Sequence, residues 1–346
     1  MSAALEPEEE SDENNYYEHH RVQTDPGQQL MRIDKFLVDR LPNLSRNRIQ
    51  NAAKAGCILV NGNPVKPNYK IKPLDDISLV MPYPKQEFEL VAEAIPLEIV
   101  FEDADLLVLY KPAGLVVHPG HGNYSGTLVN GLLHHLDGLP HPDADPVRPG
   151  LVHRLDKDTS GVMVIAKSEL AHTHLARQFF DRTVDRRYTA LVWGELEEEE
   201  GTITGHIGRS RKNRKVMDVY PDGSFGKHAV THYKVLKRLG YVTLVECKLE
   251  TGRTHQIRAH FRHLRHPLFG DLTYEGDRIW KGTSFTKYKQ FIQNCFQVLP
   301  RQALHAKTLD FTHPKTGERL HFEAPMPDDF QEVLDKWDTY VRSVKS

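Results

Sequence analysis

The sequence predicts an α+β fold in two domains. The chain has 346 residues, enough for about two domains of roughly 150 residues each, and a chain of this length can bury a sizeable core. Two stretches near the N-terminus carry the signals of short helices, followed by a hairpin signal. From residue 88 onward strands and loops dominate, with a few helices, a mixture that favours a mixed and mainly antiparallel sheet.

Residues 1–20 are expected to form a disordered tail. The segment carries seven acidic residues, no Lys or Arg, and few apolar side chains. Because its charge is all negative, the remainder of the chain has a net charge of +5, although the whole chain has −2. The main body is therefore mildly basic, and the tail is interpreted as a solubilising segment.

A small domain is predicted over residues 30–82. Its first helix is indicated by four apolar residues at amphipathic spacing: Ile33, Phe36, Leu37 and Leu41. Ser45 is a suitable N-cap for a second helix that runs through Ala55 and ends at Gly56. The Asn61-Gly62 pair between apolar runs predicts a hairpin, and residues 77–80 complete the domain as a strand.

Basic and polar side chains decorate the second helix: Arg46, Asn47, Arg48 and Lys54. In the order of its elements and in the segment GCILVNGNPV, the domain resembles the RNA-binding domain named after ribosomal small-subunit protein four. That resemblance implies RNA binding, with Arg46 and Arg48 as substrate contacts. The alternative is a small α+β domain with ordinary surface charges. Residues 83–90 are expected to be a linker, since they hold Pro84 among polar residues.

The larger domain is predicted over residues 91–335. Helices are indicated at 127–136 and 169–181, and a third at 285–296 has an aromatic stripe that we assign to the core rather than to base stacking. Strands are predicted at the following apolar runs: 99–101, 106–109, 162–167, 188–192, 230–236 and 242–249.

The strongest functional signal is the segment HRLDKDTSG at residues 153–161, which leads directly into an apolar run. A charged turn before a buried strand places Asp156 on a loop at the edge of a rigid sheet, where catalytic residues are often held. The segment resembles the active-site motif of the RluA-type pseudouridine synthases. The resemblance implies that Asp156 is the essential catalytic residue and that Arg154 binds substrate.

In that family the aspartate acts on the ribose side of a target uridine. The glycosidic bond breaks, the uracil turns, and the ring is rejoined through a carbon atom. The resemblance implies the same reaction here, with no metal or redox cofactor. Whether the Asp156 carboxylate attacks as a nucleophile or removes a proton stays open in the sequence.

A second motif, RRYTALV at residues 186–192, resembles the family's strand that carries a tyrosine against the uracil ring. The resemblance implies that Tyr188 stacks on the base and takes part in proton transfer. Arg186 and Arg187 precede it and could hold phosphates. Of the two, Arg187 is the predicted substrate-binding residue.

A third motif, TGRTHQIR at residues 251–258, resembles a basic segment of the family nearly letter for letter. The resemblance implies that Arg258, on a loop, forms an ion pair with Asp156, because a guanidinium can donate two parallel hydrogen bonds to a carboxylate. Ile257 would offer an apolar surface near the base, and Arg253 would contact the RNA backbone. In a final motif at 304–314, Leu304 and Ala306 are expected to pack beneath the site, and the KPAG turn at 111–114 is interpreted as architectural.

Other classes of protein fit the sequence less well. Three isolated cysteines, Cys57, Cys247 and Cys295, indicate neither a disulfide framework nor a metal site, and they suit a reducing cytoplasm. The N-terminus lacks the order of a signal peptide, and no apolar run approaches the ~18 residues of a membrane span. No metal-ligand cluster is visible, and no cofactor is expected.

The motifs together predict a cytoplasmic pseudouridine synthase most like the enzymes that act on the large ribosomal subunit. Its expected partner is large-subunit (23S) ribosomal RNA or a pre-ribosomal particle. A monomer is expected, although the sequence leaves the oligomeric state open. Two alternatives remain: the same chemistry on other rRNA or on tRNA uridines, and a non-catalytic ribosome-assembly factor that kept the fold.

Overall fold

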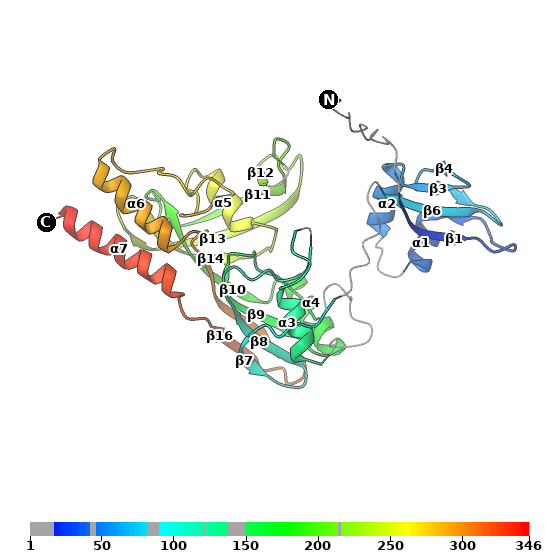
Figure 1. Ribbon diagram of the computed structural model, residues 1–346, viewed down its shortest axis with the longest axis horizontal. Coiled ribbons are helices and arrows are strands. Elements are labelled where there is room, and N and C mark those ends of the chain that lie inside the picture. The colour runs from blue at the N-terminus through cyan, green and yellow to red at the C-terminus, as the bar shows by residue number, and fades with distance from the viewer. Residues whose placement is uncertain are drawn as a thin grey trace, which may run out of the picture. The chain divides into compact units, whose positions relative to one another are not determined.

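A computed structural model describes residues 17–41, 46–81, 90–120, 122–137, 150–213 and 216–345. The chain divides into two compact units, residues 1–89 and 90–346, each with its own core (Figure 1). Together they confirm the predicted α+β class, with a small helix-and-hairpin unit ahead of a large, mostly antiparallel sheet.

The first unit packs two helices against a four-stranded sheet of order β1-β6-β3-β4. The predicted helices are present as α1 (Ile33–Arg40) and α2 (Arg46–Lys54), and the predicted stripe of α1 is buried. Asn61 and Gly62, with φ of 50° and 81°, form the predicted turn. The strands of the unit are β1 (Tyr17–Gln23), β2 (Met31–Arg32), β3 (Ile58–Val60), β4 (Asn63–Pro64), β5 (Lys70–Ile71) and β6 (Asp76–Met81).

The first strand corrects the predicted extent of the tail. Residues 17–20 belong to β1, which pairs antiparallel with β6, so they are not disordered and the unit begins well before residue 30. The strand is ordered by the backbone partners that β6 offers, which local composition does not register. An ion pair between Arg21 and Asp76 at 2.6 Å strengthens the pairing. The rest of the tail, the N-cap at Ser45 and residues 83–89 of the linker lie outside the described residues.

The second unit is built on one sheet of order β12-β11-β13-β14-β10-β15-β9-β8-β7, with β16 beside β15. Among the described strand pairs of this sheet, only β15 and β9 are parallel. The strands are β7 (Glu98–Glu102), β8 (Leu106–Lys111), β9 (Ser160–Ala166), β10 (Asp185–Trp193), β11 (Glu200–Arg209), β12 (Met217–Tyr220), β13 (Lys227–Arg238), β14 (Val242–Leu249), β15 (Leu304–Thr312) and β16 (Arg319–Glu323).

Five helices complete the described part of this unit: α3 (Leu128–His135), α4 (Glu169–Asp181), α5 (Gln256–His263), α6 (Thr286–Val298) and α7 (Asp328–Lys345). Most of the predicted aromatic stripe is in the core, where Tyr288 and Ile292 of α6 pack near Trp337 of α7 and Trp193 of β10. Phe285, which precedes the helix, is an exception, because it is 74% exposed. Among the described helices, none has both the length and the apolar character needed to cross a membrane.

The central strands β9, β10 and β15 support the predicted site: β10 carries Tyr188, and β9 follows the loop that carries Asp156. Their contact requires a glycine at the start of β9: Gly161 has φ +129°, and a Cβ there would lie 2.2 Å from the carbonyl oxygen of Ala306. Beside it, the Ser160 hydroxyl and the His305 ring are 3.0 Å apart. The close approach fixes the end of the loop that carries Asp156 against the middle of the sheet.

The packing of the N-terminal unit depends on a buried carboxylate, that of Asp34. Asp34 is fully buried, and it accepts hydrogen bonds from Arg32 at 2.9 Å, Arg46 at 3.2 Å and Gln50 at 2.7 Å. The Arg32 contact is the largest influence on the pKa of Asp34 and holds it far below its usual range. The carboxylate thus ties the start of α1 to α2.

Replacing Asp34 by Asn should destabilise the N-terminal unit by about 1–3 kcal/mol, because a buried hydrogen-bonded charge is lost while the exposed arginines can be solvated again. Since the pKa of Asp34 is lower in the folded state, its contribution is present above the unfolded pKa of about 3.9 and is lost as the pH falls below it. Hydrogen exchange of residues 17–81 measures the effect, and Arg40→Gln, which removes an exposed ion pair with Asp25, is the control. Equal exchange in Asp34→Asn and wild type at pH 7 would contradict the assignment.

Candidate active site

The loop that carries Asp156 is held to the sheet at several backbone atoms. The Lys111 side chain is buried and donates to three carbonyl oxygens, those of Pro112 at 2.8 Å, Leu115 at 2.8 Å and Lys157 at 2.9 Å. On the other side, Nη1 of Arg301 donates to the carbonyl oxygen of Asp158 at 3.1 Å. Lys111, the first residue of the KPAG turn, thus bonds directly to the loop that carries Asp156, in agreement with the architectural role predicted for the turn.

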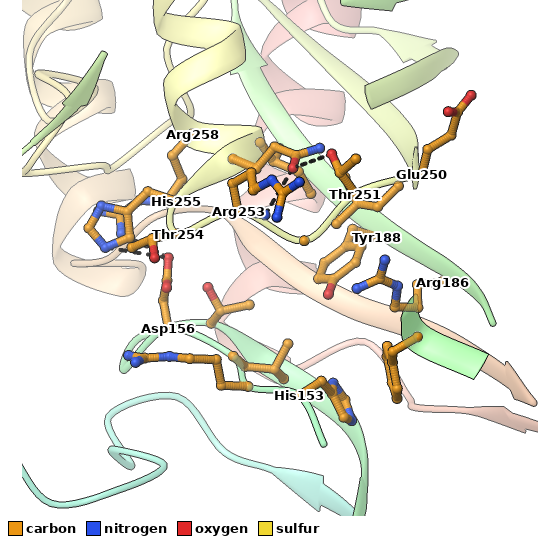
Figure 2. A pocket seen from close by; sticks show the side chains of 18 of the residues that line it. His153, Asp156, Arg186, Tyr188, Glu250, Thr251, Arg253, Thr254, His255 and Arg258 are labelled. Atoms are coloured by element: carbon orange, nitrogen blue, oxygen red, sulfur yellow. Dashed lines mark hydrogen bonds and ion pairs between the residues drawn. The ribbon is translucent and has the colours of Figure 1, made fainter. Parts of the chain in front are cut away.

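The predicted ion pair between Asp156 and Arg258 is present. Nη1 of Arg258 lies 3.0 Å from Oδ2 of Asp156, although the two residues are 102 positions apart in the sequence. Arg258 was expected on a loop, but it lies in the first turn of α5. The Arg258 side chain is buried, whereas the Asp156 side chain is 19% exposed. Arg258 is therefore fixed in the core, and Asp156 faces the pocket (Figure 2).

A second carboxylate, which the motifs did not identify, holds the arginine from behind. Asp271 is fully buried and accepts from both Nε and Nη2 of Arg258, at 2.7 and 2.8 Å. It also accepts hydrogen bonds from the backbone N–H groups of Thr273 and Tyr274. Burial alone would lower the pKa of Arg258, but the bonds and charges of Asp271 and Asp156 raise it above its ordinary value. The guanidinium therefore stays charged.

His255 and Tyr274 close the network around this ion pair. His255 has φ +53° and precedes α5. Its Nε2 lies 3.8 Å from Oδ2 of Asp156, too far for a direct hydrogen bond, and its Nδ1 is 3.1 Å from the Tyr274 hydroxyl. Burial lowers the pKa of His255 below its usual value, which favours the neutral ring at pH 7. The Tyr274 ring in turn lies 5.1 Å from the Arg258 guanidinium.

Asp156, Tyr188 and Arg258, the three side chains predicted for the reaction, line one pocket of about 530 Å³ together with Ile257. Tyr188 extends from β10 and is buried over Leu304 and Ala306, which pack beneath the site as predicted. Burial raises the pKa of the Tyr188 phenol, while Arg186 acts in the opposite direction. The hydroxyl is therefore protonated at neutral pH and can donate.

The two arginines before Tyr188 occupy opposite faces of β10, because side chains alternate along a strand. Arg187, the predicted substrate contact, is not brought into the pocket: it pairs with Asp185 at 3.2 Å and with Glu246 at 2.7 Å. Arg186 lies on the same face as Tyr188 and lines the pocket instead. The alternation could have identified Arg186 from the sequence.

The remaining predicted contacts fall into two groups. Arg154 and Arg253 both line the pocket. Nη1 of Arg154 is 3.1 Å from Nε2 of His118, and Nε of Arg253 donates to the carbonyl oxygen of His228 at 3.0 Å. In the N-terminal unit, Arg46 bonds to Asp34 with half of its side chain exposed, while the side chain of Arg48 lies outside the described residues. Among the described residues, no three His, Cys, Asp or Glu side chains are placed to hold a metal ion.

Comparisons with known families agree with this geometry. Residues 105–263 match the family of RNA pseudouridylate synthases, and residues 31–77 match the S4 domain, as expected for the small RNA-binding unit. The pocket residues Asp156, Tyr188 and Arg258 all fall within the first match.

Three relatives extend the similarity over most of the chain. An uncharacterised RNA pseudouridine synthase of Chlorobaculum parvum is 49% identical over 91% of this chain and 97% of its own length. An uncharacterised RNA pseudouridine synthase of Bacillus subtilis is 46% identical over 89% of this chain and 94% of its own length. The ribosomal large subunit pseudouridine synthase D of Zymomonas mobilis is 44% identical over 87% of this chain and 92% of its own length. The two-unit fold, the pocket and these matches together establish that the chain belongs to the RluA-type RNA pseudouridine synthases.

Proposed function

We propose that this enzyme converts specific uridines to pseudouridine in large-subunit (23S) ribosomal RNA, in the cytoplasm, with Asp156 as the catalytic residue. The observation that carries the proposal is the Asp156 carboxylate, held by Arg258 in the pocket that Tyr188 also lines. The choice of RNA is supported by relatives at 43–44% identity over 87–88% of this chain whose names specify the large ribosomal subunit.

The reaction needs no oxidant, reductant or second substrate, because it rearranges one nucleotide. The bond from C1′ to N1 of the uracil breaks, a bond from C1′ to C5 forms, C5 loses a proton and N1 carries one in the product. Asp156 acts on the ribose side, and the neutral phenol of Tyr188 lies against the ring and serves in proton transfer. Arg258 orients the carboxylate, and Ile257 supplies apolar surface for the base.

The small N-terminal unit would supply affinity rather than chemistry. Its match to the S4 domain supports binding to structured RNA, such as large-subunit rRNA or a pre-ribosomal particle. A monomer is the state we propose, because Asp156, Tyr188 and Arg258 already meet in one pocket within a single chain.

The target is tested by mapping pseudouridines in total RNA from cells with and without this protein. We expect one or a few sites to disappear from large-subunit rRNA and to return when the protein is supplied on a plasmid. Loss of sites only from tRNA or small-subunit rRNA would show the same chemistry on another RNA. An unchanged map, together with inactive purified protein, would indicate an assembly factor that has lost catalysis.

Substituting Asp156 by Asn should abolish the reaction without weakening RNA binding. The amide keeps the shape of the side chain but cannot act as a base or nucleophile, so we expect single-turnover rates to fall by more than about 10³-fold. Affinity for rRNA should be equal or higher, because a negative charge near phosphates is removed.

Asp335→Asn, which neutralises an exposed carboxylate on α7, is the matched control and should behave as wild type. Substantial product from folded Asp156→Asn protein would refute the catalytic assignment.

Tyr188→Phe separates the ring from its hydroxyl. The ring still stacks on the base, so RNA affinity should be unchanged, while the loss of the proton donor should slow product formation by about 10²-fold. Rapid-quench measurement of pseudouridine in a single turnover gives the rate, and a binding titration gives the affinity. A wild-type rate in this variant would reduce Tyr188 to a packing residue.

A further inference from the structure

The pocket contains a buried positive charge that the proposed reaction does not use. Arg186 is only 8% exposed, and its guanidinium lies 5.3 Å from the centre of the Phe179 ring. Its Nε has no hydrogen-bond partner, and among the described residues no carboxylate lies within 4 Å of its guanidinium. Arg258 and Arg301, the other buried arginines of the described chain, each hold a carboxylate with two hydrogen bonds.

Among the described residues, the titratable groups around Arg186 form no ion pair with it. The His153 ring stacks on the Phe179 ring, with 4.8 Å between the ring centres. His153 is neutral, because burial and, to a lesser extent, Arg186 lower its pKa to about 3. Tyr188 is protonated, and Glu250 of the same pocket is engaged by His232 at 2.7 Å and Arg182 at 3.5 Å. An ionised group that is buried without a partner is unfavourable, so this site is suited to receive an anion.

The approach to the guanidinium is kept open by Gly252. A Cβ at that position would lie 3.0 Å from Nη1 of Arg186, closer than an ordinary contact. The φ of Gly252 is not in the left-handed region, so the backbone conformation does not itself require glycine there. The missing side chain therefore leaves room at the nitrogen that a ligand would reach from the pocket.

We propose that Arg186 binds one backbone phosphate of the RNA next to the target uridine. This inference rests on the proposed function and adds an anchoring contact to it. A guanidinium matches the geometry of a phosphate because it donates two parallel hydrogen bonds. In Figure 2, Tyr188 lies between Asp156 and Arg186. All three residues line one pocket, so the RNA strand that carries the target uridine into it passes within reach of the Arg186 guanidinium.

Such a contact has a specific task. Extracting a base from its stack is unfavourable by a few kcal/mol, and a grip on the adjacent phosphate offsets part of it. It also makes the enzyme select a nucleotide within a chain, because a free nucleoside has no phosphate to offer. Arg186 is therefore a binding and positioning residue, distinct from the catalytic carboxylate.

Arg186→Met tests the inference by binding and single-turnover measurements on an rRNA stem-loop that contains the modified uridine. The variant should bind about ten- to a hundredfold more weakly, as expected when hydrogen bonds to a charged group are lost. The slope of log affinity against log salt should fall by about 0.7–0.9, the value for one phosphate contact. Its thermal melting should equal or exceed that of wild type, because a buried, unpaired charge has been removed.

Arg187→Met is the matched control, since it removes the same charge from the next residue, on the other face of β10. It should keep wild-type affinity at the pocket and the wild-type salt slope. Arg186→Lys should recover the salt slope and only part of the affinity, because the ammonium keeps the charge but not the paired donors.

Replacing single phosphates of the stem-loop by neutral methylphosphonates identifies the linkage. One linkage beside the target uridine should weaken binding to wild type and to Arg187→Met, and leave binding to Arg186→Met unchanged. If Arg186→Met binds like wild type, or if every linkage affects both proteins equally, the inference is overturned and the proposed function stands. A wild-type protein that forms no pseudouridine in this RNA would overturn the proposed function, and the inference with it.

Discussion

The active site depends on one buried guanidinium that is shared by two carboxylates. Asp271 accepts hydrogen bonds from Nε and Nη2 of Arg258, which fixes the plane of the guanidinium. The remaining nitrogen, Nη1, is thereby directed at Asp156. Removing one partner from a buried ion pair typically costs about 3–5 kcal/mol, because the other charge is left uncompensated. The position of the Asp156 carboxylate is therefore set by the buried pair of Arg258 and Asp271.

The rest of the unit supports this arrangement from two directions. The start of α5 and the turn at 268–276 bring Arg258 and Asp271 together, and the Thr273 and Tyr274 amides hold Asp271 in place. From the other side, Lys111 and Arg301 bind carbonyl oxygens of the loop that carries Asp156. Holding a reactive group rigidly before the substrate arrives reduces the reorganisation that the reaction requires.

Local patterns predicted the elements well where the pattern itself determines the structure. Helix 169–181 and strand 242–249 have the predicted bounds, and the apolar run after Asp156 is the fully buried β9. The Asp156–Arg258 pair was expected only through the family resemblance, because no local signal joins residues 102 positions apart.

The misses share a physical cause, which is dependence on a distant partner. Asp271 was not foreseen, because nothing near it in the sequence reveals that a buried arginine needs it. Residues 17–20 were assigned to the tail, because their order comes from β6 and not from their own composition. Arg187 was chosen over Arg186, although strand alternation with Tyr188 favours Arg186 as the residue that lines the pocket.

The most direct test of this account is the single-turnover rate of Asp271→Asn on large-subunit rRNA. The Asn side-chain oxygen can still accept hydrogen bonds from the backbone N–H groups of Thr273 and Tyr274. The turn is therefore preserved, while the ion pair with Arg258 is lost. The rate should be at least about tenfold lower, with unchanged RNA affinity and an intact fold, because Asp156 loses its fixed orientation. A folded Asp271→Asn enzyme with the wild-type rate would show that the buried pair does not position the catalytic carboxylate.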